Sequence, residues 1–424
     1  MQRRSGLVPR LPRDAWVVLG GDALSAVGSG LTLPFLLVYL SRIRDIDLVT
    51  AGLAVSTVAL AGFAGNPFGG WLTDRWGSRW SLVCGLTLAA AGAFLIAGVR
   101  SPWQAFVAVS VAGFGVAIVV PSQDSLLAVV VEPRHRSAVF AVRNATLNAG
   151  YGIGAVLASL IVDLTSSASF VLLYVVDGLT FLVFVPVLWL LLPGAGARPA
   201  DLGRPSQAQA TSGYALVLRD RTFLRTWVLI ALLVTVGFSQ TLAAFPVFAT
   251  GDGGISAAAL SIAFAINTVI VVVAQLPVLR LMDGHRRTTG IVVACLLWAA
   301  AWAVTFLAGQ FDGVSAVAGF CLALGVFGVG ETFLAPSQAA LVNDLAPDDL
   351  RGRYNGLYTL AWTAGFLVGP AVAASALAAG RAGLLFAGLI LACGIAALGA
   401  VRLRSHLPAG TDLVSMQTSD DRIS

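Results

Sequence analysis

The sequence predicts an all-α integral membrane protein, with twelve transmembrane helices in two pseudo-symmetric six-helix bundles. Three observations carry this expectation: the composition, the recurrence of long apolar runs, and an internal repeat. Of the 424 residues, 58% are hydrophobic and 11% are charged, and the mean hydropathy is +0.87. Soluble domains carry roughly 25% charged residues. The composition therefore excludes an ordinary soluble protein.

Apolar runs long enough to cross a bilayer recur along the whole chain. The first extends from about residue 15 to 40 and exceeds the ~7–15-residue core of a signal peptide, so it is expected to be retained. The other expected spans are 48–71, 80–99, 102–131, 137–163 and 168–193, and then 222–248, 257–281, 288–309, 314–343, 354–378 and 382–403. We expect bundles at 1–193 and 222–403, a cytoplasmic linker at 194–221 rich in Pro, Gly, Ser and Arg, and a cytoplasmic tail at 404–424.

Arginine placement predicts the orientation, because cytoplasmic flanks collect positive charge. If the N-terminus is cytoplasmic, every arginine falls at a cytoplasmic end or loop except Arg42, Arg44, Arg100 and Arg381. We therefore expect a multi-pass protein of the cell (plasma) membrane with both termini in the cytoplasm.

An internal repeat supports two related halves. Residues 121–154 align without gaps to 336–369, and the identical pairs include Pro121/Pro336, Ser122/Ser337, Gln123/Gln338, Arg136/Arg351, Gly150/Gly365 and Gly154/Gly369. Composition alone does not force proline, glycine and arginine to recur at a fixed offset. Duplicated six-span halves with a substrate site between them are typical of secondary transporters.

A charged turn between the second and third spans carries a family resemblance. It reads Gly70-Trp71-Leu72-Thr73-Asp74-Arg75-Trp76-Gly77-Ser78-Arg79. The pattern Gly-x-Leu-x-Asp-Arg-x-Gly-x-Arg resembles the loop between the second and third helices of major facilitator superfamily transporters. The chain is similar over nearly its whole length to twelve-span drug-efflux members of the drug:proton antiporter kind.

The resemblance implies that this turn is a conformational latch, formed by Gly70, Asp74, Arg75, Gly77 and Arg79. It assigns Asp74 to a contact with the other half, where the start of the eleventh span near Arg353 offers a cation and a helix dipole. Arg75 and Arg79 are expected to face the cytoplasm, and for Arg79 simple obedience to the positive-inside rule remains an equal alternative. The second-half copy of the turn keeps Asp283 but is otherwise degenerate.

The resemblance also predicts a Gly-x-x-x-Gly-Pro element in the fifth span. Gly150 and Gly154 are present there without the proline, while the eleventh span carries Gly365, Gly369 and Pro370. Small residues at this spacing allow close helix packing, which is the role expected for all five.

Ionisable residues inside the spans are the candidates for proton coupling, because their burial in a bilayer is costly. Asp22 heads a polar stripe with Ser25, Ser29 and Thr32 on one helical face of the first span. Glu331 lies well inside the tenth span. In the family the first, fourth, seventh and tenth spans line the substrate cavity, so both acids are expected there.

A departure from the family pattern concerns the fourth span. Antiporters of the family often carry an arginine where this chain has Val109. Arg143, which leads a stripe with Asn144, Asn148 and Tyr151 in the fifth span, is our candidate to replace it as countercharge to Asp22. The alternative is that Arg143 extends to the lipid headgroups. Asp124 and Asp177 are weaker candidates.

No catalytic or metal-binding pattern is present. The four cysteines are scattered singly, and the three histidines show no ligand cluster. We expect no enzyme, metal or cofactor, with the proton gradient as driving force. The expected partners are a small-molecule substrate and the lipid bilayer, not nucleic acid, and the protein is expected to be monomeric. Export of hydrophobic or amphipathic compounds is the first functional hypothesis. The alternatives are an importer or facilitator of a nutrient or metabolite, and a non-transporting membrane sensor.

Overall fold

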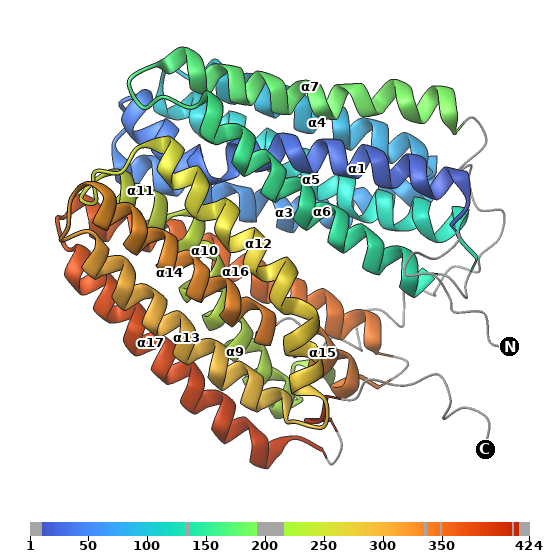
Figure 1. Ribbon diagram of the computed structural model, residues 1–424. Coiled ribbons are helices and arrows are strands. Elements are labelled where there is room, and N and C mark those ends of the chain that lie inside the picture. The colour runs from blue at the N-terminus through green and yellow to red at the C-terminus, as the bar shows by residue number, and fades with distance from the viewer. Residues whose placement is uncertain are drawn as a thin grey trace, which may run out of the picture. The chain divides into compact units, whose positions relative to one another are not determined.

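The computed structural model describes residues 11–132, 136–192, 216–334, 337–347, 350–408 and 411–414. Almost all of these residues are helical, and the strand-like pairing within them is one isolated bridge between Arg286 and Leu413. The all-α expectation is therefore confirmed for this part of the chain (Figure 1). Most of the expected linker, 194–215, lies outside the described residues, as do Pro336 and His135.

The chain divides into two compact units, residues 1–202 with 256–265, and 203–255 with 266–424. The expected bundle boundaries at 193 and 222 remain a prediction. The helices occupy the positions of all the expected spans. They are α1 (Arg13–Thr32), α3 (Leu48–Trp76), α4 (Ser78–Ala97), α5 (Pro102–Val130), α6 (Arg136–Ile161), α7 (Ser167–Leu191), α9 (Arg221–Val236), α12 (Ala257–Met282), α13 (Arg287–Ala308), α14 (Gly313–Leu334), α16 (Arg351–Ala378) and α17 (Ala382–Leu403).

Eleven helical segments of the described residues are long and apolar enough to cross a membrane. The 26-residue helix α6 is not among them, although it occupies the fifth expected span. Its sequence includes Arg143, Asn144 and Asn148, which lower its hydropathy. Of these three polar residues, Arg143 is the one that belongs to the charged cluster described below.

Three expected spans are interrupted helices. After α1 the chain continues through η1 (Leu33–Phe35), α2 (Leu36–Val38) and η2 (Tyr39–Ile43), because Pro34 has no backbone N–H to continue the α-helical ladder. The seventh span is α9, α10 (Phe238–Leu242) and α11 (Ala244–Thr250), with breaks at Gly237 and Ala243. The tenth ends as α14, and the following residues form the separate helix α15 (Gln338–Leu345).

In the first unit the helices pack in pairs that fix the candidate site. Helix α1 contacts both α6 and α7, and α5 contacts α3 and α4. Figure 1 shows α1 in blue beside α6 and α7, in teal to green. The buried apolar core of this unit draws on residues such as Leu19, Leu86, Leu126 and Phe184.

In the second unit aromatic rings fill the interior. Trp298 and Phe327 stack with centroids 4.6 Å apart and planes 2° from parallel, and Trp302 and Phe386 continue the cluster. Offset or parallel ring stacking adds roughly 0.5–1.5 kcal/mol to the burial of such pairs. The indole N–H groups of Trp298 and Trp302 donate to the backbone oxygens of Phe327 and Val236, so no indole of this cluster is left unsatisfied.

Candidate functional site

A buried charged cluster lies between α1, α5 and α6 in the first unit. Arg143 Nε lies 2.8 Å from Asp22 Oδ2, and Arg143 Nη1 lies 2.7 Å from Asp124 Oδ1. The third donor, Arg143 Nη2, binds Gln123 Oε1 at 2.8 Å, and Gln123 Nε2 in turn donates to Asp22 Oδ1. One guanidinium thus contacts two carboxylates and an amide.

The three charged side chains differ in their access to water. Their relative exposures are 2% for Asp22, 12% for Arg143 and 45% for Asp124. With both carboxylates ionised the cluster carries one net negative charge, and with one of them protonated it is neutral. Asp124 is therefore the only member of the cluster that is substantially exposed.

Close packing of α1 on α6 brings Arg143 to Asp22. A Cβ on Gly150 would meet the Cβ of Ala26 at 2.6 Å, and one on Gly154 would meet the Cα of Gly30 at 2.7 Å and the backbone oxygen of Val27. Only glycine allows this approach. Gly150 lies seven residues after Arg143 and so near the same face of α6.

A second buried carboxylate faces the same helix from α7. Ser29 Oγ donates to Asp177 Oδ1 at 3.4 Å, and Thr32 Oγ1 donates to Asp177 Oδ2 at 3.0 Å. The polar stripe of α1 is therefore shared between two acids, with Asp22 turned to α5 and α6 and its later members turned to α7. The hydroxyl of Ser25 is buried between them with no hydrogen-bond partner among the described residues.

Sequence reasoning gave Asp124 and Asp177 little weight. For Asp177 a signal existed, since a lone acid in a strongly apolar span needs hydrogen-bond partners, and the stripe at Ser29 and Thr32 offers hydroxyls. For Asp124 the internal repeat offered a signal, because the equivalent position of the second half is Ala339. The acid is therefore specific to the first half of the chain.

Glu331 lies partly buried on α14 in the second unit. The side chain of Asn267, on α12, hydrogen-bonds to it, and Asn267 Nδ2 also donates to the backbone oxygen of Leu324 at 3.2 Å. No ion pair to Glu331 is found among the described residues. Glu331 therefore differs from Asp22 in having a neutral amide rather than a guanidinium as its partner.

The second unit repeats the cluster without its charges. By the offset of the repeat, Gln338 stands for Gln123 and Tyr358 for Arg143. Tyr358 Oη donates to Gln338 Oε1 at 3.4 Å, as Arg143 donates to Gln123. The hydrogen bond between these two positions is kept in both halves, and only in the first half is one of the two residues charged.

Asn148 does not join the charged cluster. Its side-chain amide donates to the backbone oxygen of Asn144 at 3.0 Å, one turn earlier on α6. The expected role of Asn148 in a substrate cavity remains a prediction.

The residues of the expected latch lie where α3 meets α4. Gly77 ends α3 with φ of 87°, a conformation that favours glycine, while Asp74 and Arg75 are exposed. The guanidinium of Arg75 lies 5.8 Å from the Trp71 ring centroid. Arg79 instead joins α4 to α7, donating to the Trp189 backbone oxygen at 3.1 Å with its guanidinium 4.4 Å from that indole.

At the end of α3, Gly69 rather than Gly70 makes the close approach to α5 within this unit. A Cβ on Gly70 would meet nothing within 4 Å, whereas one on Gly69 would lie 2.8 Å from the Cα of Ile118 on α5. Helical geometry turns successive residues by about 100°, so only one of two adjacent glycines can face α5. Arg353 lies at the start of α16, and the contact proposed between it and Asp74 remains a prediction.

Packing glycines recur on α16. A Cβ on Gly365 would lie 2.6 Å from the Cβ of Val234, and the backbone oxygen of Gly369 accepts from Gln240 Nε2 at 3.2 Å. Pro370 follows within the helix and is buried. Helix α16 therefore lies close against α9 and α10, as α6 does against α1.

The C-terminal segment binds the second-half copy of the turn, a contact that sequence reasoning missed. Asp412 accepts from the backbone N–H and the hydroxyl of Thr288, both at 2.9 Å, at the start of α13. Gly284 N donates to Val414 O, and Val414 N donates to His285 O, each at 2.9 Å. Residues near the C-terminus thus supply hydrogen-bond partners for the turn around Asp283.

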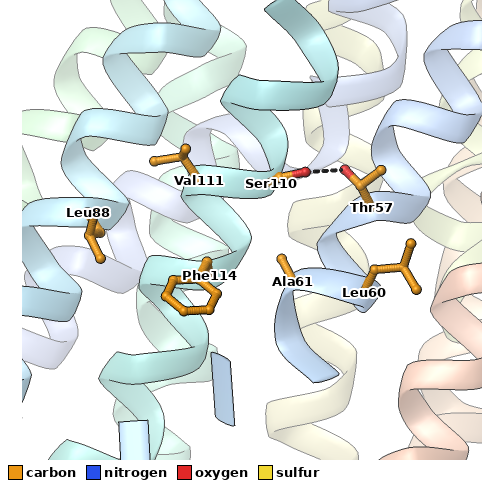
Figure 2. A pocket seen from close by; sticks show the side chains of 7 residues that line it. All are labelled: Thr57, Leu60, Ala61, Leu88, Ser110, Val111 and Phe114. Carbon is orange, nitrogen blue, oxygen red and sulfur yellow. Dashed lines mark hydrogen bonds between the residues drawn. The ribbon is translucent and has the colours of Figure 1, made fainter. Parts of the chain in front are cut away.

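A mostly apolar pocket of about 460 Å³ lies between α3, α4 and α5. Figure 2 shows its lining, in which Ser110 Oγ donates to Thr57 Oγ1 at 3.1 Å beside Leu60, Leu88 and Phe114. No ionisable residue lines it. It offers an apolar surface but no group that could couple a proton to a substrate.

Curated relatives match most of the chain at low identity. An uncharacterized MFS-type transporter of Bacillus subtilis, YttB, is 23% identical over 367 residues, covering 85% of this chain and 87% of its own. A Na(+), Li(+), K(+)/H(+) antiporter of Planococcus maritimus is 24% identical, covering 84% and 88%. The multidrug resistance protein MdtH of Cronobacter sakazakii is 26% identical, covering 82% and 84%.

Solved structures show the same fold. A POT family transporter in complex with a thioalcohol-conjugated peptide superposes with a TM-score of 0.76 at 13% identity, covering 93% of this chain and 96% of its own. The nucleoside transporter NupG gives 0.70 at 15%, covering 93% and 99%. The family model of the Major Facilitator Superfamily matches residues 18–254 and 241–415. With its all-α architecture and its apolar spans, the chain belongs to the Major Facilitator Superfamily of membrane transporters.

Proposed function

We propose that this chain is a proton-coupled exporter of small hydrophobic or amphipathic compounds that works by alternating access. The observation that carries the proposal is the cluster of two carboxylates on one guanidinium, Asp22 and Asp124 on Arg143. A buried cluster whose net charge changes by one unit on protonation can bind either a proton or a cationic compound, but binds both at once poorly.

The proton enters and leaves through Asp124 in this mechanism. Its carboxylate is half exposed, whereas both oxygens of Asp22 are held by Arg143 and Gln123. Loss of the proton leaves the cluster with a net negative charge that favours a cationic or amphipathic substrate. Renewed protonation removes that charge and favours substrate release.

Glu331 is the second proposed coupling residue. It lies on a cavity-lining span by analogy with the family, and its neutral Asn267 partner leaves its charge uncompensated. We propose that ionisation of Glu331 changes the net charge of the second half, as ionisation of the Arg143 cluster changes that of the first. No cofactor enters the cycle, and the proton gradient supplies the free energy.

The names of the relatives support the direction and the coupling. MdtH is named for multidrug resistance, and the Planococcus protein as a monovalent cation/proton antiporter. The second name makes exchange of Na⁺, Li⁺ or K⁺ for protons the alternative function. We place the protein in the plasma membrane as a monomer, and the distribution of its arginines supports a cytoplasmic position for both termini.

Transport into inverted membrane vesicles tests the proposal. Vesicles containing the wild-type protein are acidified inside, and uptake of a panel of neutral and cationic dyes is compared with uptake of Na⁺, Li⁺ and K⁺. We expect at least one dye to accumulate and to leave when the gradient is collapsed. Gradient-driven uptake of the metal ions alone would establish the alternative, and uptake of every compound unaffected by the gradient would refute proton coupling.

A further inference from the structure

A groove of about 510 Å³ lies on the surface of the second unit between α9 and α17. Its two ends differ in chemistry. Arg225, Arg402 and His406 line one end, while the remaining lining is apolar and includes Val228, Leu232 and Ile395. The groove is therefore amphipathic along its length.

The basic side chains meet at one end because the two helices run antiparallel. Arg225 lies in the second turn of α9, and Arg402 lies one residue before the end of α17. From Arg225 the groove continues to Leu232, about 10 Å along the helix at 1.5 Å per residue. This is a span over which a hydrocarbon chain can lie against the protein.

Gly399 keeps the groove open. A Cβ at this position would lie 3.7 Å from Leu229 Cδ1, an ordinary contact, so a larger side chain would extend into the groove. Val228 and Ile395 are 59% and 56% exposed, so an acyl chain lying in the groove can contact both side chains.

Neighbouring charges do not neutralise the basic end. Asp220 caps α9 through the backbone N–H groups of Thr222 and Phe223, and its other oxygen accepts from Tyr354 on α16. Arg404 is turned to α13, where it donates to Thr288 and Thr289. Among the described residues no ion pair is found for Arg225 or Arg402, so both guanidinium groups remain available to an anion.

We propose that this groove binds one anionic phospholipid. Its phosphate lies between Arg225 and Arg402 beside His406, and one acyl chain lies along Val228, Leu232 and Ile395. Basic pockets between membrane helices recognise anionic lipid headgroups. The groove is separate from the proposed proton-coupling residues. Lipid binding there therefore does not depend on which compound the protein transports.

Native mass spectrometry of the full chain in detergent tests the site, with phosphatidylglycerol and phosphatidylcholine titrated separately. For the wild type we expect one tightly bound phosphatidylglycerol, favoured at least about tenfold over phosphatidylcholine. Arg225→Gln with Arg402→Gln removes that preference. Arg381→Gln, at the opposite end of α17, is the matched control and keeps it.

Filling the groove provides the second arm. Gly399→Leu lowers phosphatidylglycerol binding, whereas Gly388→Leu, where a Cβ would meet nothing within 4 Å, leaves it unchanged. Melting temperatures verify that each variant is folded. The site is refuted if the double arginine variant keeps the lipid preference, if Arg381→Gln loses it equally, or if Gly399→Leu binds lipid as the wild type does.

Discussion

Arg143 is the residue on which the charged cluster depends. Its guanidinium donates hydrogen bonds to Asp22, Asp124 and Gln123, which lie on two other helices. A buried carboxylate that loses its cationic partner is strongly destabilised, because the charge remains out of water without compensation. The arrangement makes the two acids and the guanidinium interdependent rather than additive.

Replacing Arg143 is therefore expected to cost stability. Arg143→Gln should lower the free energy of unfolding by about 3–5 kcal/mol, as for other broken buried pairs, seen as a lower melting temperature in detergent. The double variant Asp22→Asn with Arg143→Gln should recover much of the loss, because no buried charge is left at Asp22. Arg75→Gln, at an exposed arginine, is the control. Equal melting of Arg143→Gln and Arg75→Gln would contradict the account.

The pairing of Asp22 with Arg143 could be predicted from the sequence together with its family resemblance. Val109 in place of an expected arginine pointed to Arg143 as a substitute countercharge for Asp22, and the structure places them 2.8 Å apart. The ion pair between Asp124 and Arg143 could not be predicted, because it depends on how α5 and α6 are rotated about their own axes relative to each other. Sequence spacing fixes the face of one helix, but not the side to which a neighbouring helix turns.

At the scale of elements, α1 connects the two buried acids of the first unit. It packs on α6 through Gly30, Gly150 and Gly154, and on α7 through Ser29, Thr32 and Asp177. A change in the spacing of α1 and α6 would therefore also change the ion pair at Asp22.

Gly154→Ala tests this packing. The added methyl group would press on Gly30 and Val27, so we expect a loss of about 1–3 kcal/mol in stability, typical of overpacked sites, together with reduced transport. Gly20→Ala is the control on the same helix pair, because its Cβ would meet nothing within 4 Å. Thermal melting of both variants decides the point, and an undisturbed Gly154→Ala would show that α1 and α6 need no close contact.

The docking of the C-terminal segment on α13 is a second property of elements. Asp412→Ala removes an acceptor for the Thr288 N–H, and we expect a loss of about 0.5–2 kcal/mol, the usual value of a helix cap. Thermal melting and protease accessibility of residues 283–288 measure the effect. Asp312→Ala, in the turn before α14, is the comparison. If both variants melt alike, Asp412 contributes nothing as a cap.

Element positions were predictable, and their interruptions only in part. The long apolar runs gave the positions of the long helices, because a helix that crosses a bilayer needs about 20 mostly apolar residues. The breaks at Pro34 and Gly237, and the separation of α15 from α14, follow from local backbone chemistry and tertiary contacts that hydropathy does not report. The contact between Asp412 and α13 joins residues far apart in the sequence, and no local pattern indicates it.

At the scale of the whole molecule, the two halves are similar in fold and different in charge. The repeat and the turn at Gly70–Arg79 were sufficient to predict the family, because both are patterns of backbone-determining residues. Within each unit the same hydrogen-bonded positions recur, as Arg143 with Gln123 and Tyr358 with Gln338, but only the first carries ions. We infer that proton coupling is asymmetric, with the first half supplying the charged cluster and the second half Glu331.

The measurement that tests proton coupling at this cluster most directly is transport of ethidium, a cationic dye, by purified protein in liposomes. Two modes are compared: accumulation driven by an acidic interior, and exchange of labelled dye at equal pH. Asp22→Asn should lose gradient-driven accumulation by at least about tenfold and should also exchange ethidium more weakly than the wild type, because the cluster no longer gains a net negative charge on deprotonation. Asp14→Asn, earlier in α1, should behave as the wild type. Gradient-driven accumulation by Asp22→Asn equal to that of the wild type would contradict the assignment.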